Sequence, residues 1–328
     1  MRAMILAAGY GTRLWPLTID RAKPAIPFMG QPLVGYVAEY LARFGCDEVV
    51  VNLHHQAQTV RDALGDGRHF GVRMHYVEES VILGTSGALD NARHLLDGDT
   101  FIVINGKIAT DIDLSEALRT HRAANAIATL ILKPNPRRER FSTVLVDGGL
   151  LQEFGPHPQT SSVSDNVGDV PLMFTGIQIL EPRIFSYIPR GVFSHSTTEV
   201  YPQAIARGER IAAHISDGMW HELSTIRRYL ETSIELLQHE GRDVIAGQDS
   251  HVSVSADVRE AVLWENVIVD AGARIRRAVI GAGVHVGSGE VIENAVVVRA
   301  ELVEGTERPP QALAGEMRGA NFVAPIMG

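Results

Sequence analysis

MILAAGYGTRLWPLTIDRAKPAIPFMGQPL, residues 4–33, decides how the rest of the chain is interpreted. Its apolar start predicts a buried β-strand, and GYGTR follows at residues 9–13. Two glycines in such a loop let the backbone approach a ligand closely and offer N–H groups to phosphate oxygens. Arg13 and, ten residues later, Lys23 add two cations that suit a triphosphate. The stretch therefore predicts a strand and a phosphate-binding loop, whereas a lone Gly-x-Gly would indicate only a turn.

Short apolar runs alternate with amphipathic stretches as far as about residue 215, which predicts an α/β fold with a mostly parallel sheet flanked by helices. The expected strands are AMILAA (3–8), EVVVNL (48–53), RMHYV (73–77), FIVIN (101–105) and AIATLILK (126–133), and FSTVLVDGGLLQEF (141–154) is expected to form a hairpin. Helical spacing is found at Leu33, Val37, Tyr40, Leu41 and Phe44, and again at Leu114, Ala117, Leu118 and His121.

A different pattern begins near residue 250, after a predicted helix at TIRRYLETSIELLQHEG (225–241). Aliphatic residues followed by small ones recur about every six positions, most clearly in IGAGVH (280–285) and VGSGEV (286–291). This repeat is typical of a triangular parallel β-helix, here of two to three coils. We therefore expect an α/β domain over residues 1–240, a β-helix over 250–304 and an irregular tail over 305–328.

Composition excludes several classes of function. The 328 residues carry a formal net charge of −9, which gives no electrostatic footprint for nucleic acid or an anionic membrane. No run of 18 apolar residues predicts a membrane span, and the amino terminus lacks a signal-peptide cleavage site. The single Cys46 cannot form an internal disulfide, is expected to pack beside the helix end at Gly45, and fits a reducing cytoplasm.

The chain resembles the sugar-1-phosphate nucleotidyltransferases over nearly its whole length. Their opening Gly-x-Gly-Thr-Arg-Leu-x-Pro-Leu-Thr stretch and following Lys-Pro are matched at residues 9–18 and at Lys23-Pro24. Further matches are VNLHHQ (51–56), LGTSGAL (83–89), FTGI (174–177) and the terminal hexapeptide repeat, and they are most like the mannose-1-phosphate guanylyltransferase branch. The resemblance implies a Rossmann-like fold over 1–240 and a left-handed β-helix after it.

The resemblance also implies the reaction of an NTP with a sugar 1-phosphate to give an NDP-sugar and pyrophosphate. Arg13 would hold the leaving pyrophosphate, and Lys23 would bind phosphate oxygens near the attack. Glu78 and Glu79 are expected to form a solvated loop pair, and contact of one of them with the ligand stays open as the alternative. Nucleotide contacts are expected from Ala7, Ala8, Gly9, Gly11, Thr12, Arg13, Gly84, Thr85, Gly87, Asn105 and Gly106, and sugar-phosphate contacts from Ser142, His157, Thr175 and Gly176.

Three departures from the family pattern stand out. Where members read Asn-Gly-Asp, with an aspartate that holds Mg²⁺, this chain has Lys107 after Asn-Gly. Where they read Trp-x-Asp-x-Gly-Thr, the second metal carboxylate is replaced by Glu222. Where they read Phe-x-Glu-Lys-Pro, Pro156 and His157 take the place of the charged pair.

Three explanations of Lys107 stay open. In the first, the site works: Lys107 is catalytic, or Mg²⁺ binds a weakened site through Glu222 and Asp111. In the second, the protein binds nucleotide or NDP-sugar without turnover, as a sensor or regulatory subunit, with Lys107 paired to Glu222. In the third, Lys107 is an engineered substitution. The substrates expected are an NTP and a sugar 1-phosphate, and the expected assembly is a homo-oligomer formed through the β-helix.

Overall fold

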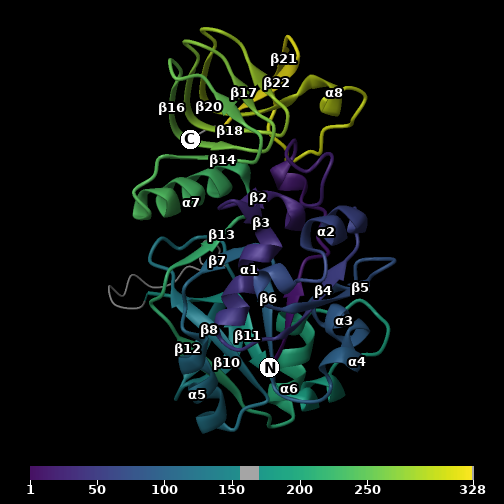
Figure 1. Ribbon diagram of the computed structural model, residues 1–328. Coiled ribbons are helices and arrows are strands. Elements are labelled where there is room, and N and C mark those ends of the chain that lie inside the picture. The colour runs from purple at the N-terminus through teal and green to yellow at the C-terminus, as the bar shows by residue number, and fades with distance from the viewer. Residues whose placement is uncertain (156–169, 327–328) are drawn as a thin grey trace. The chain divides into compact units, whose positions relative to one another are not determined.

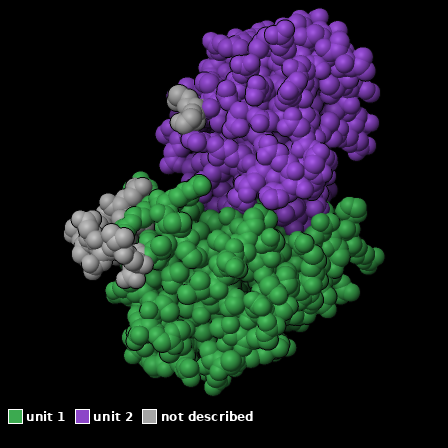
Figure 2. Space-filling model, turned by 90° about the vertical axis from the view of Figure 1, so that its left-hand side faces the viewer, with its two compact units in different colours: residues 1–8, 37–54, 65–220 green, residues 9–36, 55–64, 221–328 purple. Residues whose placement is uncertain are grey.

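The computed structural model describes residues 1–155 and 170–326, which fall into two compact units (Figure 2). Unit 1 comprises Met1–Ala8, Val37–His54 and Gly65–Trp220. Unit 2 comprises Gly9–Tyr36, His55–Leu64 and His221–Gly328. The chain thus enters unit 2 with the first residue of GYGTR. His157 lies outside the described residues.

Unit 1 contains a nine-stranded mixed sheet with the strand order β5-β4-β1-β6-β11-β8-β12-β10-β9 (Figure 1). The predicted strands are confirmed as β1 (Arg2–Leu6), β4 (Glu48–Leu53), β5 (Arg73–Glu78), β6 (Phe101–Asn105) and β8 (Ala128–Pro134), and the predicted hairpin as β9 (Thr143–Asp147) with β10 (Leu150–Gly155). The remaining strands are β11 (Leu172–Leu180) and β12 (Ile211–Ile215). The run from β5 to β6 is parallel, whereas β11 lies antiparallel to both β6 and β8.

The helices associated with this sheet begin and end close to where the periodicity places them. Helix α1 (Leu33–Arg43) starts in unit 2 and continues into unit 1, and α5 (Leu114–Ala124) buries the whole predicted face from Leu114 to His121. The carboxylate of Asp113 caps α5 by accepting from the Ser115 N–H. The other elements are α3 (Gly84–Asn91), α4 (Arg93–Leu96), α6 (Tyr201–Ala206), the short 3₁₀ turns η3 (Arg68–Phe70) and η4 (Pro182–Ser186), the π-helical turn η5 (Ser196–Val200) and the short strand β7 (Ile108–Thr110).

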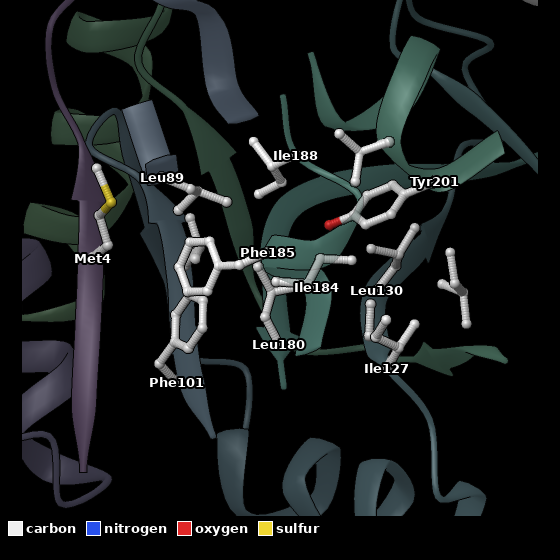
Figure 3. Packing of buried hydrophobic residues seen from close by; sticks show 14 of the residues in the cluster. Met4, Leu89, Phe101, Ile127, Leu130, Leu180, Ile184, Phe185, Ile188 and Tyr201 are labelled. Atoms are coloured by element: carbon white, nitrogen blue, oxygen red, sulfur yellow. The ribbon is translucent and has the colours of Figure 1, made fainter. Parts of the chain in front are cut away.

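One apolar cluster fixes α3 and α6 against the sheet (Figure 3). Leu89 of α3 and Tyr201 of α6 belong to the same cluster as Met4 and Leu130 of the strands. The rings of Phe101 and Phe185 stack with their centroids 5.7 Å apart. Each fully buried side chain of this size contributes about 1.5–3 kcal/mol of transfer free energy. The cluster therefore holds the start of α3, which carries LGTSG, rigidly beside the strands.

Unit 2 joins the segment 9–36 to the C-terminal part of the chain. That segment contains the 3₁₀ turns η1 (Thr12–Leu14) and η2 (Lys23–Ala25) and the two-residue strands β2 (Pro27–Phe28) and β3 (Gln31–Pro32). Helix α2 (Ala57–Leu64) also belongs to unit 2. The predicted connecting helix is confirmed as α7 (Ile226–His239), which follows β13 (Trp220–Glu222) and buries Leu230, Ile234 and Leu237.

The C-terminal repeat folds into the predicted parallel β-helix, in which each coil takes 17 residues: Asp257 pairs with Arg274, and Arg274 with Val291. One sheet contains β14 (Val244–Ala246), β16 (Asp257–Leu263), β18 (Arg274–Ile280) and β20 (Val291–Arg299) (Figure 1), and another is formed by β15 (His251–Val252), β17 (Ile268–Val269) and β19 (His285–Val286). Glu260, Arg277 and Asn294, also 17 residues apart, all have positive φ and mark the same corner of successive coils.

The segment after residue 304 differs from the expectation of an irregular tail. After α8 (Ala300–Val303), the strands β21 (Glu316–Arg318) and β22 (Asn321–Pro325) continue the sheet, and β22 runs antiparallel to β20. Phe322, Val323 and Ala324 are buried there, so this short apolar run covers the edge of the last full coil. Within the described residues, no helix is long and apolar enough to cross a membrane.

Candidate active site

The glycine loop folds back onto Lys23 within unit 2. Gly11 has φ +68°, and its carbonyl accepts the Leu14 N–H at 2.8 Å and the Thr18 hydroxyl at 3.3 Å. A Cβ atom at Gly11 would lie 2.9 Å from the Cβ of Lys23. Arg13 is exposed in the η1 turn that follows. The glycine loop and Lys23 therefore lie against each other, and Arg13 follows the loop in the η1 turn.

Helix α2 and the residue before it hold the chain just before Lys23. The backbone N–H of Ala22 donates to the Thr59 hydroxyl at 3.0 Å. The side-chain amide of Gln56 donates to the Ile19 carbonyl at 2.7 Å. Both contacts use backbone groups of the segment 19–22, so they fix the course of the chain into η2 independently of its side chains.

A buried polar relay in unit 1 joins the end of β1 to LGTSG. The N–H of Ala7 donates to Asn52 Oδ1 at 2.7 Å, and Asn52 Nδ2 donates to Glu79 Oε1 at 2.6 Å. The other carboxylate oxygen of Glu79 accepts the Leu83 N–H at 2.9 Å. Asn52 and Glu79 are each 4% exposed, so the expectation of a solvated pair is wrong for Glu79, although Glu78 is exposed. A buried carboxylate requires such donors, and these fix the LGTSG loop.

Gly84 and Gly87 are needed for a close backbone approach. A Cβ atom at Gly84 would lie 2.5 Å from the Ser194 carbonyl oxygen, and one at Gly87 would lie 2.6 Å from that of Val192. The Ser86 N–H donates to the Ser194 carbonyl at 3.0 Å, and the Ser194 N–H donates to that of Leu83 at 3.0 Å. At both predicted glycines, the space that a side chain would occupy is therefore filled by the backbone of residues 192–194.

Sequence reasoning missed the residues that hold Thr85. The Ser196 N–H donates to the Thr85 hydroxyl oxygen at 2.9 Å. The Thr85 N–H donates to His195 Nδ1 at 3.4 Å. Both partners lie at the start of the η5 turn, 110 residues or more from Thr85 along the chain. No local signal in the sequence connects them.

The end of β6 brings together two predicted motifs. Gly106 N–H donates to the Leu6 carbonyl at 2.9 Å, which ties Asn-Gly-Lys to the end of β1. Gly176 of FTGI has φ +79°, and a Cβ atom there would lie 2.1 Å from Asn105 Nδ2. Lys107 lies half-buried in the turn between β6 and β7. Its position at the carboxyl end of a central strand is the one expected for a ligand-facing residue.

Thr175 and Ser142, two residues predicted to bind the sugar phosphate, differ in burial and in the hydrogen bonds they make. Thr175 is 1% exposed, and its hydroxyl donates to the Ile131 carbonyl at 2.7 Å. The Thr175 carbonyl accepts the indole N–H of Trp220 at 3.0 Å. Ser142 is half-buried, and its carbonyl accepts the Phe174 N–H at 3.1 Å. The side chain of Thr175 therefore serves the sheet, while that of Ser142 is less enclosed.

Lys133 is a second lysine at a strand end that sequence reasoning overlooked. Its ammonium donates to the Gly218 carbonyl, and burial lowers the pKa of this ammonium while the charges of Asp217 and Asp111 oppose that shift. In the same turn the Met219 N–H donates to Asp111 Oδ1 at 2.6 Å. The sequence did contain a signal for Lys133. It is the last residue of the apolar run AIATLILK, just as Lys107 follows two residues after the end of FIVIN.

The two carboxylates predicted to bind metal are both engaged. Asp111 in unit 1 accepts the Met219 N–H, and in unit 2 Oε2 of Glu222 lies 3.8 Å from Nη1 of Arg228. Among residues 1–155 and 170–326, no group of three or more His, Cys, Asp or Glu side chains is arranged to hold a metal ion. The described residues therefore do not fit a dedicated Mg²⁺ cage of protein ligands.

Family models match both parts of the chain. Residues 2–239 match the model described as nucleotidyl transferase, and residues 238–306 match the model described as GlmU-like, C-terminal hexapeptide. The second match agrees with the expected left-handed β-helix.

Three relatives show the range of similarity. A UTP–glucose-1-phosphate uridylyltransferase of Synechocystis sp. is 31% identical over 81% of this chain and 71% of the relative. An N-acetylmuramate alpha-1-phosphate uridylyltransferase of Neisseria meningitidis is 34% identical over 70% of this chain and 96% of the relative. A mannose-1-phosphate guanylyltransferase of Mycobacterium tuberculosis is 27% identical over 72% and 64%, respectively.

Among solved structures, a putative glucose-1-phosphate thymidylyltransferase from Bacillus anthracis superposes with a TM-score of 0.62. It is 22% identical and covers 76% of this chain and 98% of its own. At that identity the likeness shows the fold alone.

Proposed function

The chain belongs to the nucleotidyl transferase family and is a sugar-1-phosphate nucleotidyltransferase, and we propose that it forms GDP-mannose from GTP and mannose 1-phosphate. The observation that carries nucleotidyl transfer is the close approach of Gly11 to Lys23, with Arg13 two residues after Gly11 in the η1 turn. The base and sugar are supported by the names of several relatives at 26–28% identity. UTP with glucose 1-phosphate is the second candidate, favoured by the Synechocystis relative.

The proposed reaction is an in-line displacement. A phosphate oxygen of the sugar 1-phosphate attacks the α-phosphorus of the NTP, a new P–O bond forms, and the bond to the leaving pyrophosphate breaks. We assign Arg13 to the pyrophosphate and Lys23 to phosphate oxygens near the attacked phosphorus. Both cations would stabilise negative charge that grows in the transition state, and neither needs to form a covalent bond.

We assign Lys107 a catalytic role of the same kind. Its ammonium replaces a carboxylate of the family pattern, so it would supply positive charge directly to phosphate oxygens. Any Mg²⁺ would be held mainly by the nucleotide phosphates, because Asp111 and Glu222 are engaged elsewhere. The alternative is a sensor that binds NDP-sugar without turnover; the engaged carboxylates favour it, because they weaken the metal site.

The remaining assignments follow the motifs. Backbone groups of Ala7, Ala8, Gly9, Gly11 and Thr12 would contact phosphates, and Gly84, Thr85, Gly87, Asn105 and Gly106 would contact base and ribose or α-phosphate. Ser142, Gly176, the backbone of Thr175 and His157 would contact the sugar phosphate. We further propose the domain limits 1–240 and 250–304, a homo-oligomer formed through the β-helix, and a cytoplasmic location, which the free and buried Cys46 supports.

The test is pyrophosphate release from the purified protein. Each common NTP is supplied in turn with Mg²⁺ and a panel of hexose 1-phosphates that includes mannose and glucose. Turnover with GTP and mannose 1-phosphate supports the proposal, whereas turnover with UTP and glucose 1-phosphate supports the second candidate. No release from any pair, with NDP-sugar still raising the melting temperature, would establish the sensor instead.

A further inference from the structure

Three contacts within unit 2 attach the segment 9–36 to the C-terminal part of the chain. They involve Arg21, Pro27 and Trp15 of that segment. Lys23 lies between the first two along the sequence, and Arg13 lies two residues before the third. Each cation assigned to phosphate binding is thus close in sequence to a residue that contacts the C-terminal part of the chain.

The first contact is made by Arg21, two residues before Lys23. Its Nη2 lies 2.7 Å from Glu265 Oε1, and its guanidinium carbon lies 4.9 Å from the centroid of the Trp264 ring. Trp264 and Glu265 follow directly after β16, in the turn that leads to β17. A planar guanidinium stacked on an indole and paired with a carboxylate is fixed in orientation as well as position.

The second contact brackets Lys23 from the other side. Trp264 is 2% exposed, and its indole N–H donates to the Tyr229 hydroxyl at 3.1 Å. The Tyr229 hydroxyl in turn donates to the Pro27 carbonyl. The η2 turn that carries Lys23 is therefore held before and after by groups that converge on one tryptophan of the β-helix.

The third contact lies beside Arg13. The rings of Trp15 and Phe322 meet edge to face with centroids 5.4 Å apart, and both residues are buried. Phe322 belongs to β22, the strand that was expected to be irregular tail. Trp15 directly follows the η1 turn that contains Arg13. Strand β22 therefore packs against the residue that ends the turn carrying Arg13.

We propose that the β-helix positions the phosphate-binding segment, with Arg21, Trp264 and Glu265 acting as positioning residues for Lys23 and with Phe322 supporting Arg13. This inference rests on the proposed function, because it concerns the cations of that site. It gives the short β-helix a role in the transferase reaction besides assembly. A shift of about 1 Å in a catalytic group can cost about 100-fold in rate, so contacts that position Lys23 without touching substrate can have large kinetic effects.

The Arg21–Glu265 pair is suited to a test because it is only partly enclosed. The side chains of Arg21 and Glu265 are 21% and 32% exposed, so changing them does not open a cavity in a core. Glu265→Gln keeps the shape and removes the charge. Arg21→Lys keeps the charge and removes the planar stack on Trp264. A matched control is Glu260→Gln, because Glu260 Oε2 lies 3.5 Å from Arg277 Nη1 at a corner of the same β-helix.

The kinetic test measures kcat and KM for the NTP in full-length protein. We expect Glu265→Gln and Arg21→Lys each to lower kcat by about tenfold, with a smaller change in KM, because Lys23 acts chiefly in the transition state. We expect Glu260→Gln to keep kcat within about twofold of wild type, since a surface ion pair contributes little. Equal kcat values for wild type and both Arg21–Glu265 variants would overturn the inference, as would an equal loss in the control.

Hydrogen exchange separates this inference from the proposed function. In Glu265→Gln, we expect faster amide exchange in peptides covering residues 12–26 than in wild type or Glu260→Gln. This readout needs no turnover, so it applies even if the wild type proves inactive with every NTP. If the wild type is inactive but Glu265→Gln exchanges faster than wild type, the proposed function is rejected and the positioning contact is kept. If exchange in Glu265→Gln equals that in wild type, the positioning role is rejected.

Discussion

Asn105 and Gly176 are packed so closely that a single added methyl group would overlap the amide: a Cβ atom at Gly176 would lie 2.1 Å from Asn105 Nδ2. The contact joins the end of β6 to the irregular part of β11 between Phe174 and Gln178. Gly176 also has φ +79°, where side chains are disfavoured. Asn105 and Gly176 are 71 residues apart, so two distant motifs depend on one glycine.

Replacing Gly176 tests that dependence. We expect Gly176→Ala to lower the free energy of unfolding by about 2–4 kcal/mol, since overpacking and positive φ both act there. Urea unfolding measures the change. Gly148→Ala is the matched control, because Gly148 has φ +55° with no atom within 4 Å of the added Cβ, and it should cost only about 1 kcal/mol. Equal costs at the two positions would show that the contact with Asn105 is unimportant.

The buried relay through Glu79 gives a second prediction. Both carboxylate oxygens accept N–H groups, from Asn52 and from Leu83, so Glu79→Gln turns one acceptor into a donor that faces another donor. We expect a loss of about 2 kcal/mol in the free energy of unfolding and a raised KM for the NTP, because LGTSG loses its support. The exposed neighbour provides the control: Glu78→Gln should stay within about 0.5 kcal/mol of wild type. The relay would be dispensable if both variants unfolded alike.

Much of the fold was predictable because its signals are local. The helical spacing of apolar residues from Leu114 to His121 predicts a helix, and the continuous apolar run of FIVIN predicts a strand. The family motifs likewise located the Gly11 turn. The approach of Ser194 to Gly84 could not be foreseen, because it joins segments 110 residues apart without a shared pattern.

The structure differs from the sequence-based expectations at two other places, β22 and Glu79. The strand β22 was missed because its apolar run of three residues, Phe322 to Ala324, is too short to indicate a strand by itself. Glu79 was misread because charge in a loop usually indicates solvent, whereas here two donors make burial favourable. Long-range hydrogen bonds, which the sequence does not display, decided both the relay and the support of Thr85.

The thiol of Cys46 predicts a pH dependence of stability. Cys46 is buried, and burial raises the pKa of its thiol to about 12 from 9.0. Between these values the folded state retains a proton that the unfolded chain releases, so the stabilising contribution is complete below pH 9 and is lost as the pH rises toward 12. Relative to Cys46→Ala, the wild type should lose about 1 kcal/mol of unfolding free energy between pH 9 and pH 10. Urea unfolding at both pH values measures it, and a constant difference between the two proteins would contradict the assignment.

Lys107 provides the prediction that bears most directly on chemistry. If its ammonium stabilises the phosphates in the transition state, Lys107→Ala should lower kcat by about 10²–10³-fold with little change in the melting temperature, as for other electrostatic stabilisers. Lys107→Asp should also be slow at low Mg²⁺, because it adds negative charge where positive charge is used. Measuring kcat for the three proteins against Mg²⁺ concentration distinguishes the cases. A rate for Lys107→Asp above wild type at saturating Mg²⁺ would indicate a weakened metal site that the aspartate restores, and the lysine would then have no catalytic role of its own.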